Sequence, residues 1–215
     1  MDLKRRAWQI AKKCLKRLDK RSHGIEHIKK VHEYFQFLKN NIKPKKINKE
    51  IMESLEYAII LHDIGNRDTR ESHGIQSIKI LQKEFPDFYS KLPNREWIRY
   101  VIENHSRGLG KNPKTPEQLC LAYLILLDNM DGIGMEGEKR IEKCIVKELK
   151  KPLKIVPKDN TNSVFEGLIF NHQWIDINLN RIKGNVSKKF KKEYEKLKKE
   201  NEKVILRLVK DELKS

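Results

Sequence analysis

The stretch Leu61-His62-Asp63-Ile64-Gly65 decides how this chain is interpreted, because a histidine and an aspartate close an apolar helical run. Apolar residues recur at helical spacing over 51–59, and the same period carries the core-facing side of the helix on to His62 and Asp63. We therefore expect both polar side chains to point inward. A buried imidazole beside a buried carboxylate is either hydrogen-bonded in the core or bound to a metal ion, and the dipeptide alone leaves both alternatives open.

The composition predicts an all-α protein with one substantial core. The 215 residues include only 10 Gly and 7 Pro, which favours helices over hairpins. Mean hydropathy is −0.74, so the core must come from the apolar faces of amphipathic helices. Because 151–163 is rich in Pro, Asp and Asn, we expect a main domain over 1–150 and a helical extension over 151–215. The extension is expected to pack on the main body or on a partner subunit.

Positive charge dominates the chain, with 47 Lys and Arg against 30 Asp and Glu and a formal net charge of +17. Such a field attracts anions and keeps nucleic acid, nucleotides and phosphorylated metabolites open as partners. Lysine runs such as 43–46 and 188–192 fit a solvated surface equally well. The three isolated cysteines and the lack of a long apolar run predict a cytoplasmic protein without a membrane partner, and the oligomeric state stays open.

The expected helices place histidines and aspartates at their ends. Apolar stripes predict helices over 7–18, 28–38, 48–63, 73–85, 94–105, 115–127, 165–179 and 190–208, with Asn48, Asn94 and a capping box at 115–118 as start signals. Any one histidine at such an end is more often structural than functional. Together they predict a metal site, because imidazole and carboxylate bind first-row divalent metals. The residues at these ends are His27, His62, Asp63, His73, His105 and Asp128.

The order of these residues resembles the HD-domain metal-dependent phosphohydrolases. The resemblance is carried by His27-Ile28-Lys29-Lys30-Val31, His62-Asp63-Ile64-Gly65, Asn104-His105-Ser106 and Asp128-Asn129-Met130-Asp131, and it spans roughly residues 20–135. It implies a helical bundle with additional C-terminal helices here. It also implies a first metal site of His27, His62, Asp63 and Asp128.

Members with two metals add two histidines, and His73 and His105 fall where these are found. If His73 is not a ligand, the site holds one ion and His105 contacts substrate instead. The resemblance implies one or two divalent ions, and it does not distinguish among Fe, Mn, Zn, Ni, Co and Mg.

The resemblance also implies roles for charged residues near the site. Asp63 is expected to be catalytic as the metal anchor, and Arg67 to replace the lysine that follows the motif in many members, where this chain has Asn66. A phosphate is expected to bind Arg70, Arg107, Lys111 and Lys114, each of which is otherwise a solvated surface charge. Outside this set, we expect Asp131 to support a ligand or the substrate, and His172 to be hydrogen-bonded in the core. For His23, a role in its turn is favoured over capping alone or lining the site, and His32 is expected to lie near the surface or to support the site.

The expected function is hydrolysis of a phosphate ester, most plausibly of a nucleotide or nucleotide derivative, by metal-activated water. One alternative is a basic nucleic-acid-binding or nucleotide-binding regulatory module whose metal site is structural or vestigial. The other is a di-iron oxygenase, since a few two-iron members of the family have that activity. No motif selects among phosphomonoesters, cyclic nucleotides and dinucleotides.

Overall fold

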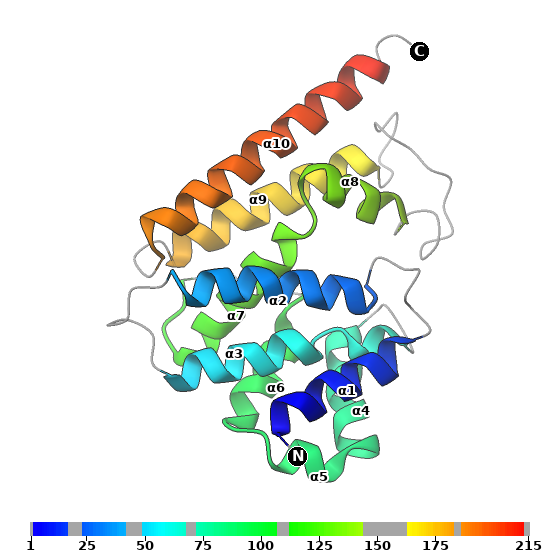
Figure 1. The fold of residues 1–215 in the computed structure, drawn as a ribbon, viewed down its shortest axis with the longest axis vertical. Coiled ribbons are helices and arrows are strands. Elements are labelled where there is room, and N and C mark those ends of the chain that lie inside the picture. The colour runs from blue at the N-terminus through cyan, green and yellow to red at the C-terminus, as the bar shows by residue number, and fades with distance from the viewer. Residues whose placement is uncertain are drawn as a thin grey trace.

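The computed structural model describes residues 2–16, 23–41, 49–67, 72–106, 112–143, 163–182 and 186–212, with only the backbone at Arg67, Lys143 and Glu212. These residues are predominantly helical, which confirms the predicted all-α class (Figure 1). A 3-10 turn spans Ile64–Arg67. The helices are α1 (Leu3–Leu15), α2 (Ile25–Lys39), α3 (Lys49–Leu61), α4 (His73–Glu84), α5 (Pro86–Ser90), α6 (Arg95–Asn104), α7 (Pro116–Met130), α8 (Gly134–Lys143), α9 (Val164–Ile182) and α10 (Lys188–Glu212).

Helix α7 is the centre of the bundle, and α2, α3, α6 and α9 all pack against it. Every residue over 120–127 is buried, which agrees with an apolar pattern that runs almost all round this helix. Because a central helix is enclosed along its length, only its ends reach solvent or a cavity. Asp128 follows the last of these buried residues and therefore lies where the packed core ends.

The C-terminal helices share the core of the main body. Helix α9 packs on α7, and α8 contacts both α9 and α10. Ile175, Ile182, Phe190 and Tyr194 belong to the same hydrophobic cluster as the residues of α1 to α7. Helix α10 lies along α9 at one edge of the molecule (Figure 1). The predicted boundary at residue 150 lies outside the described residues, and within them no helix has the length and apolarity needed to cross a bilayer.

Several helix ends differ from the prediction because tertiary contacts compete with local capping. Asn94 precedes α6 with a left-handed φ of 43°, and its side chain donates to Ser54 Oγ at 3.2 Å instead of capping the helix. Pro116 begins α7 as predicted, but Thr115 makes no side-chain cap bond. Two short helices, α5 and α8, were not predicted, and the expected cap Asn48 lies outside the described residues.

Candidate metal centre

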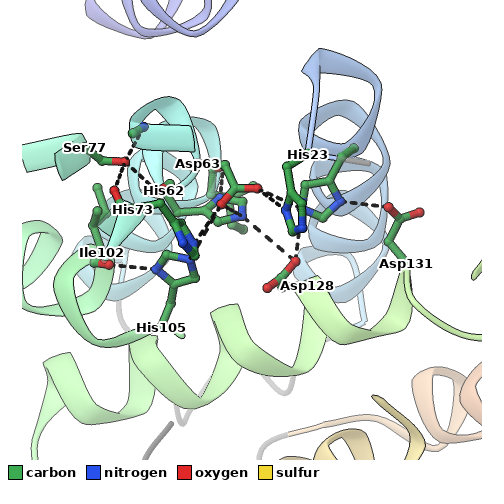
Figure 2. A network of polar contacts seen from close by, with 12 residues as sticks. His23, His62, Asp63, His73, Ser77, Ile102, His105, Asp128 and Asp131 are labelled. Carbon is green, nitrogen blue, oxygen red and sulfur yellow. Dashed lines mark hydrogen bonds and ion pairs between the residues drawn. The ribbon is translucent and has the colours of Figure 1, made fainter. Parts of the chain in front are cut away.

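The six predicted ligands meet in one place, where the ends of five helices converge. Figure 2 shows five of them, His62, Asp63, His73, His105 and Asp128. His62 and Asp63 lie in the turn after α3 and are 0% and 1% exposed, which confirms that the helical stripe carries them inward. The other four come from the first turn of α2, the start of α4, the residue after α6 and the last turn of α7: His27, His73, His105 and Asp128. Side-chain exposure rises only at the border of the cluster, to 22% for Asp128.

Glycines bring the backbones close enough to hold this arrangement. A Cβ on Gly65 would lie 2.0 Å from the carbonyl oxygen of His73, so any larger residue would push α4 away from the turn after α3. The Gly65 amide donates to Ser77 Oγ at 2.8 Å, and that hydroxyl lies 2.7 Å from the carbonyl oxygen of His62. A Cβ on Gly74 would likewise lie 2.2 Å from the Ile102 carbonyl oxygen. The helix starts and ends that carry the histidines are therefore packed directly on one another.

Three histidines have their Nδ1 atoms engaged by acceptors outside the cluster. His62 Nδ1 lies 2.8 Å from the Ile59 carbonyl oxygen, and His105 Nδ1 lies 2.7 Å from the Ile102 carbonyl oxygen. His27 Nδ1 lies 2.8 Å from Asp131 Oδ2. Because these oxygens accept only, each Nδ1 carries a hydrogen, and Nε2 is the atom that each ring directs into the cluster. This second contact is how proteins orient metal-binding histidines.

The Nε2 atom of His62 faces oxygens that also carry lone pairs. His62 Nε2 is buried, has no hydrogen-bond partner among the described residues, and lies 3.6 Å from Asp63 Oδ1 and 4.0 Å from Asp128 Oδ1. His27 Nε2 lies 3.0 Å from the same oxygen of Asp128, which is itself without a hydrogen bond of good geometry within the described chain. Orphaned acceptors facing one another in a buried site repel unless a cation lies between them. The residues present therefore fit a divalent metal ion.

Asp63 presents its two carboxylate oxygens to two different groups of histidines (Figure 2). Oδ2 lies 2.8 Å from His23 Nδ1 and 3.6 Å from His27 Nε2. Oδ1 lies 3.2 Å from His73 Nε2 and 3.7 Å from His105 Nε2. Three overlapping groups of residues each offer donor atoms that lie within 4.8 Å of one another. The groups are His23, His27 and Asp63; His27, His62 and Asp128; and His62, Asp63 and His105. This arrangement is compatible with two ions bridged by Asp63.

Burial and charge set the pKa values of these groups. Burial and Arg140 both lower the pKa of His27, but contacts with Asp128 and Asp131 outweigh them and raise it to about 9. Burial lowers the pKa of His62 to about 4, so this ring is neutral at pH 7. Burial alone would raise the pKa of Asp63, but the surrounding histidines hold it well below its usual range. Asp63 is thus ionised and His62 neutral, the protonation states that metal binding requires, whereas His27 would have to release a proton to bind an ion.

Sequence reasoning missed two residues of the cluster. The turn position of His23 predicts only turn chemistry, yet its Nδ1 lies 2.8 Å from Asp63 Oδ2, a contact that no helical pattern marks because His23 precedes α2. Arg140 of α8 also reaches the cluster, with Nη2 3.4 Å from His27 Nε2. No local pattern marks Arg140, because α8 itself was not predicted.

The predicted phosphate-binding residues are not part of the described cluster. Arg70, Arg107 and Lys111 lie outside the described residues, as does the side chain of Arg67. Lys114 is exposed and precedes α7, whose far end carries Asp128 about 18 Å away along the helix axis. The remaining histidines lie elsewhere: His32 contacts Glu56 Oε1 at 3.1 Å, and His172 contacts Asp176 Oδ2 at 3.6 Å.

Comparison with known proteins gave no relative from which a family or activity could be taken. No protein-family model, curated protein or solved structure matches the chain. The chemistry of the site therefore has to be inferred from its own residues.

Proposed function

We propose that the chain is a metal-dependent phosphohydrolase of the HD-domain type, which cleaves a phosphate ester of a nucleotide or nucleotide derivative. The observation that carries the proposal is the buried Nε2 of His62, which has no hydrogen bond in the described residues and faces Asp63 and Asp128. The residues that resemble the family in sequence are also the residues that converge in space.

His27, His62, Asp63 and Asp128 would hold the first ion, and Asp63, His73 and His105 a second. A bound divalent cation lowers the pKa of water and stabilises negative charge that develops on phosphoryl oxygens. The chain itself orients the ligands: Asp131 fixes the ring of His27, and the carbonyl groups of Ile59 and Ile102 fix those of His62 and His105.

The test is hydrolysis of a phosphomonoester and a phosphodiester, p-nitrophenyl phosphate and bis-p-nitrophenyl phosphate, by protein loaded with Mn²⁺, Fe²⁺ or Zn²⁺. We expect turnover of at least one ester, its loss on chelation and return on adding metal, and no turnover in Asp63→Asn. Glu56→Gln, which removes a buried carboxylate of α3 outside the cluster, is the matched control and should remain active. Equal turnover in Asp63→Asn and the wild type would refute the proposal.

A second candidate function, nucleic-acid binding, is favoured by a row of lysines on α10. Six exposed lysines repeat every three, four or seven residues and face away from the buried side of the helix, which includes Phe190, Asn201 and Leu208. The row extends about 30 Å, a length that matches several successive phosphates of a nucleic-acid strand. These residues, here named the lysine ridge, are Lys189, Lys192, Lys196, Lys199, Lys203 and Lys210.

The lysine ridge can be tested without metal. A variant with Gln at 192, 199 and 203 is compared, in chelator, with a variant that has Gln at the exposed positions 12, 16 and 83. If the ridge binds phosphates, single-stranded RNA binding should weaken and the slope of log affinity against log salt should flatten by about two in the first variant only. Equal affinity in both variants, or no binding by the wild type, would reject this candidate.

A further inference from the structure

Arg140 places a guanidinium group beside the atoms that would hold the first metal ion. Its Nη2 lies 3.4 Å from His27 Nε2, 3.4 Å from His23 Nδ1 and 3.8 Å from Asp128 Oδ1. Its Nη1 lies 3.5 Å from Asp131 Oδ2. The side chain is 16% exposed, whereas that of His27 is 1% exposed, so Arg140 stands between the buried cluster and solvent.

The position of Arg140 is fixed by the packing of α8 on the turn that follows α7. A Cβ on Gly137 would lie 2.4 Å from the carbonyl carbon of Gly132, so the first turn of α8 lies directly on this backbone. Asn171 of α9 donates to the Gly132 carbonyl oxygen at 2.8 Å, and Asn201 of α10 accepts from the Gly134 amide at 3.0 Å. Helices α9 and α10 therefore hold α8 in place, and with it the arginine at the cluster.

A guanidinium and a divalent cation repel each other at this separation. Both would be close to His27 Nε2 and Asp128 Oδ1, and arginine does not lose its proton to relieve the repulsion. The two cations are compatible when an anion lies between them. A phosphate group is suited to this role, because its oxygens can bind a metal on one side and accept two parallel hydrogen bonds from a guanidinium on the other.

We propose that Arg140 is a phosphate-binding residue of the site, which holds the phosphoryl group of the substrate against the metal centre. The inference rests on the proposed metal-dependent function and adds a contact that the sequence did not indicate. It also gives the C-terminal helices α9 and α10 a role, because they hold α8, the helix that carries Arg140. The alternative is that Arg140 only balances the negative charges of Asp128 and Asp131.

The test uses Mn²⁺-loaded protein and inorganic phosphate as the probe, with calorimetric titration for the affinity and elemental analysis for bound metal. Arg140→Gln removes the guanidinium, and Arg140→Lys keeps the positive charge but cannot form the bidentate hydrogen bonds of a guanidinium. Lys139→Gln is the matched control, because it removes one positive charge from the same helix at a side chain that is 58% exposed. Thermal melting establishes that each variant is folded, and Arg140→Lys carries the test if Arg140→Gln does not fold.

We expect Arg140→Gln to weaken phosphate binding on the order of 10-fold to 100-fold while it keeps the Mn²⁺ ratio and binds Mn²⁺ at least as tightly as the wild type. Arg140→Lys should recover part of the loss, and Lys139→Gln should bind phosphate like the wild type. Unchanged phosphate affinity in Arg140→Gln, or loss of Mn²⁺ together with phosphate, would overturn the inference and favour charge balance. A wild type that binds no Mn²⁺ would instead refute the proposed function itself.

Discussion

Asp63 and Glu56 are both buried carboxylates that lie seven residues apart, Glu56 within α3 and Asp63 in the turn after it. Their surroundings nevertheless differ in kind. Asp63 is 1% and Glu56 4% exposed. Glu56 receives cations and donors from its own chain: Lys4 Nζ lies 2.9 Å from Oε2, His32 Nε2 lies 3.1 Å from Oε1, and Gln36 donates to Oε1 at 3.3 Å. Asp63 is surrounded by imidazole rings instead.

The difference separates a carboxylate that lysine, histidine and glutamine side chains satisfy from one whose histidine neighbours form a group that could hold a metal ion. Burial raises the pKa of Glu56, but hydrogen bonds from His32 and Lys4 outweigh it and lower the pKa to about 2. At Asp63, two of the surrounding rings, His62 and His105, already donate from Nδ1 to backbone carbonyl groups. Buried carboxylates alone therefore do not indicate a site; the direction of the neighbouring lone pairs does.

The largest expected effect, on the amount of bound metal, comes from replacing one histidine beside each carboxylate by alanine. His62→Ala removes the orphaned Nε2 from the cluster and should abolish metal binding at the first site, whereas His32→Ala removes a partner of Glu56 and should leave the metal-to-protein ratio unchanged. Elemental analysis after dialysis against Mn²⁺ measures both. Metal retained at the wild-type ratio in His62→Ala would remove the distinction between the two carboxylates.

The next effect is stabilisation of the fold by metal. Because the cluster joins the ends of five helices, an ion bound only by the folded state should raise the free energy of unfolding by about 2.7 kcal/mol at 100 times its dissociation constant. Urea unfolding with Mn²⁺ and with chelator measures this difference. It should vanish in Asp63→Asn and persist in Glu56→Gln, and stabilisation of equal size in Asp63→Asn would place the ion elsewhere.

A smaller effect is expected for the carboxylate behind His27. Asp131→Asn weakens the acceptor that lies 2.8 Å from His27 Nδ1, and loss of such a supporting contact typically lowers metal affinity about 10-fold to 100-fold. Asp176→Asn is the control, because Asp176 also lies beside a histidine, His172, but belongs to α9 and not to the cluster. Its carboxylate accepts a hydrogen bond from the Tyr194 hydroxyl at 2.7 Å. Competition titration with a metal-sensitive dye gives both affinities, and equal values in the two variants would deny Asp131 its supporting role.

The smallest effect concerns Glu56 and its dependence on pH. Its folded-state pKa is lowered from 4.5 to about 2, so its stabilisation is fully present above pH 4.5 and is lost as the pH falls toward 2. Glu56→Gln should lower the free energy of unfolding by about 1–3 kcal/mol at neutral pH, because it removes a charged hydrogen-bond acceptor. The loss is no larger because Lys4 and Lys39 are partly exposed and can be solvated when the carboxylate is removed.

The difference between wild type and Glu56→Gln should shrink when urea unfolding is repeated at about pH 3, because the unfolded wild type then binds a proton at Glu56 while the folded carboxylate is still largely ionised. A difference that is equally large at both pH values would show that Glu56 does not stabilise the fold through its charge.

The parts that could be predicted from sequence are those set by helical period. Apolar spacing located most of the helices and carried His62 and Asp63 to the inside, because a side chain's direction on a helix follows from its position alone. His23 precedes α2 in the turn, where no period applies, and Arg140 reaches the cluster only through the packing of α8. The capping expected at Asn94 is replaced by its hydrogen bond to Ser54, a contact between residues 40 positions apart.

The most direct test of the metal centre is the metal-to-protein ratio of protein purified anaerobically without chelator and then reloaded, measured in the wild type, His73→Ala, Asp63→Asn and Glu56→Gln. A centre bridged by Asp63 predicts two ions in the wild type, one in His73→Ala, none in Asp63→Asn and two in Glu56→Gln. One ion in both the wild type and His73→Ala would remove His73 from the site. No ion in the wild type after reloading, or equal ratios in Asp63→Asn and Glu56→Gln, would contradict the claim that this cluster is a metal centre.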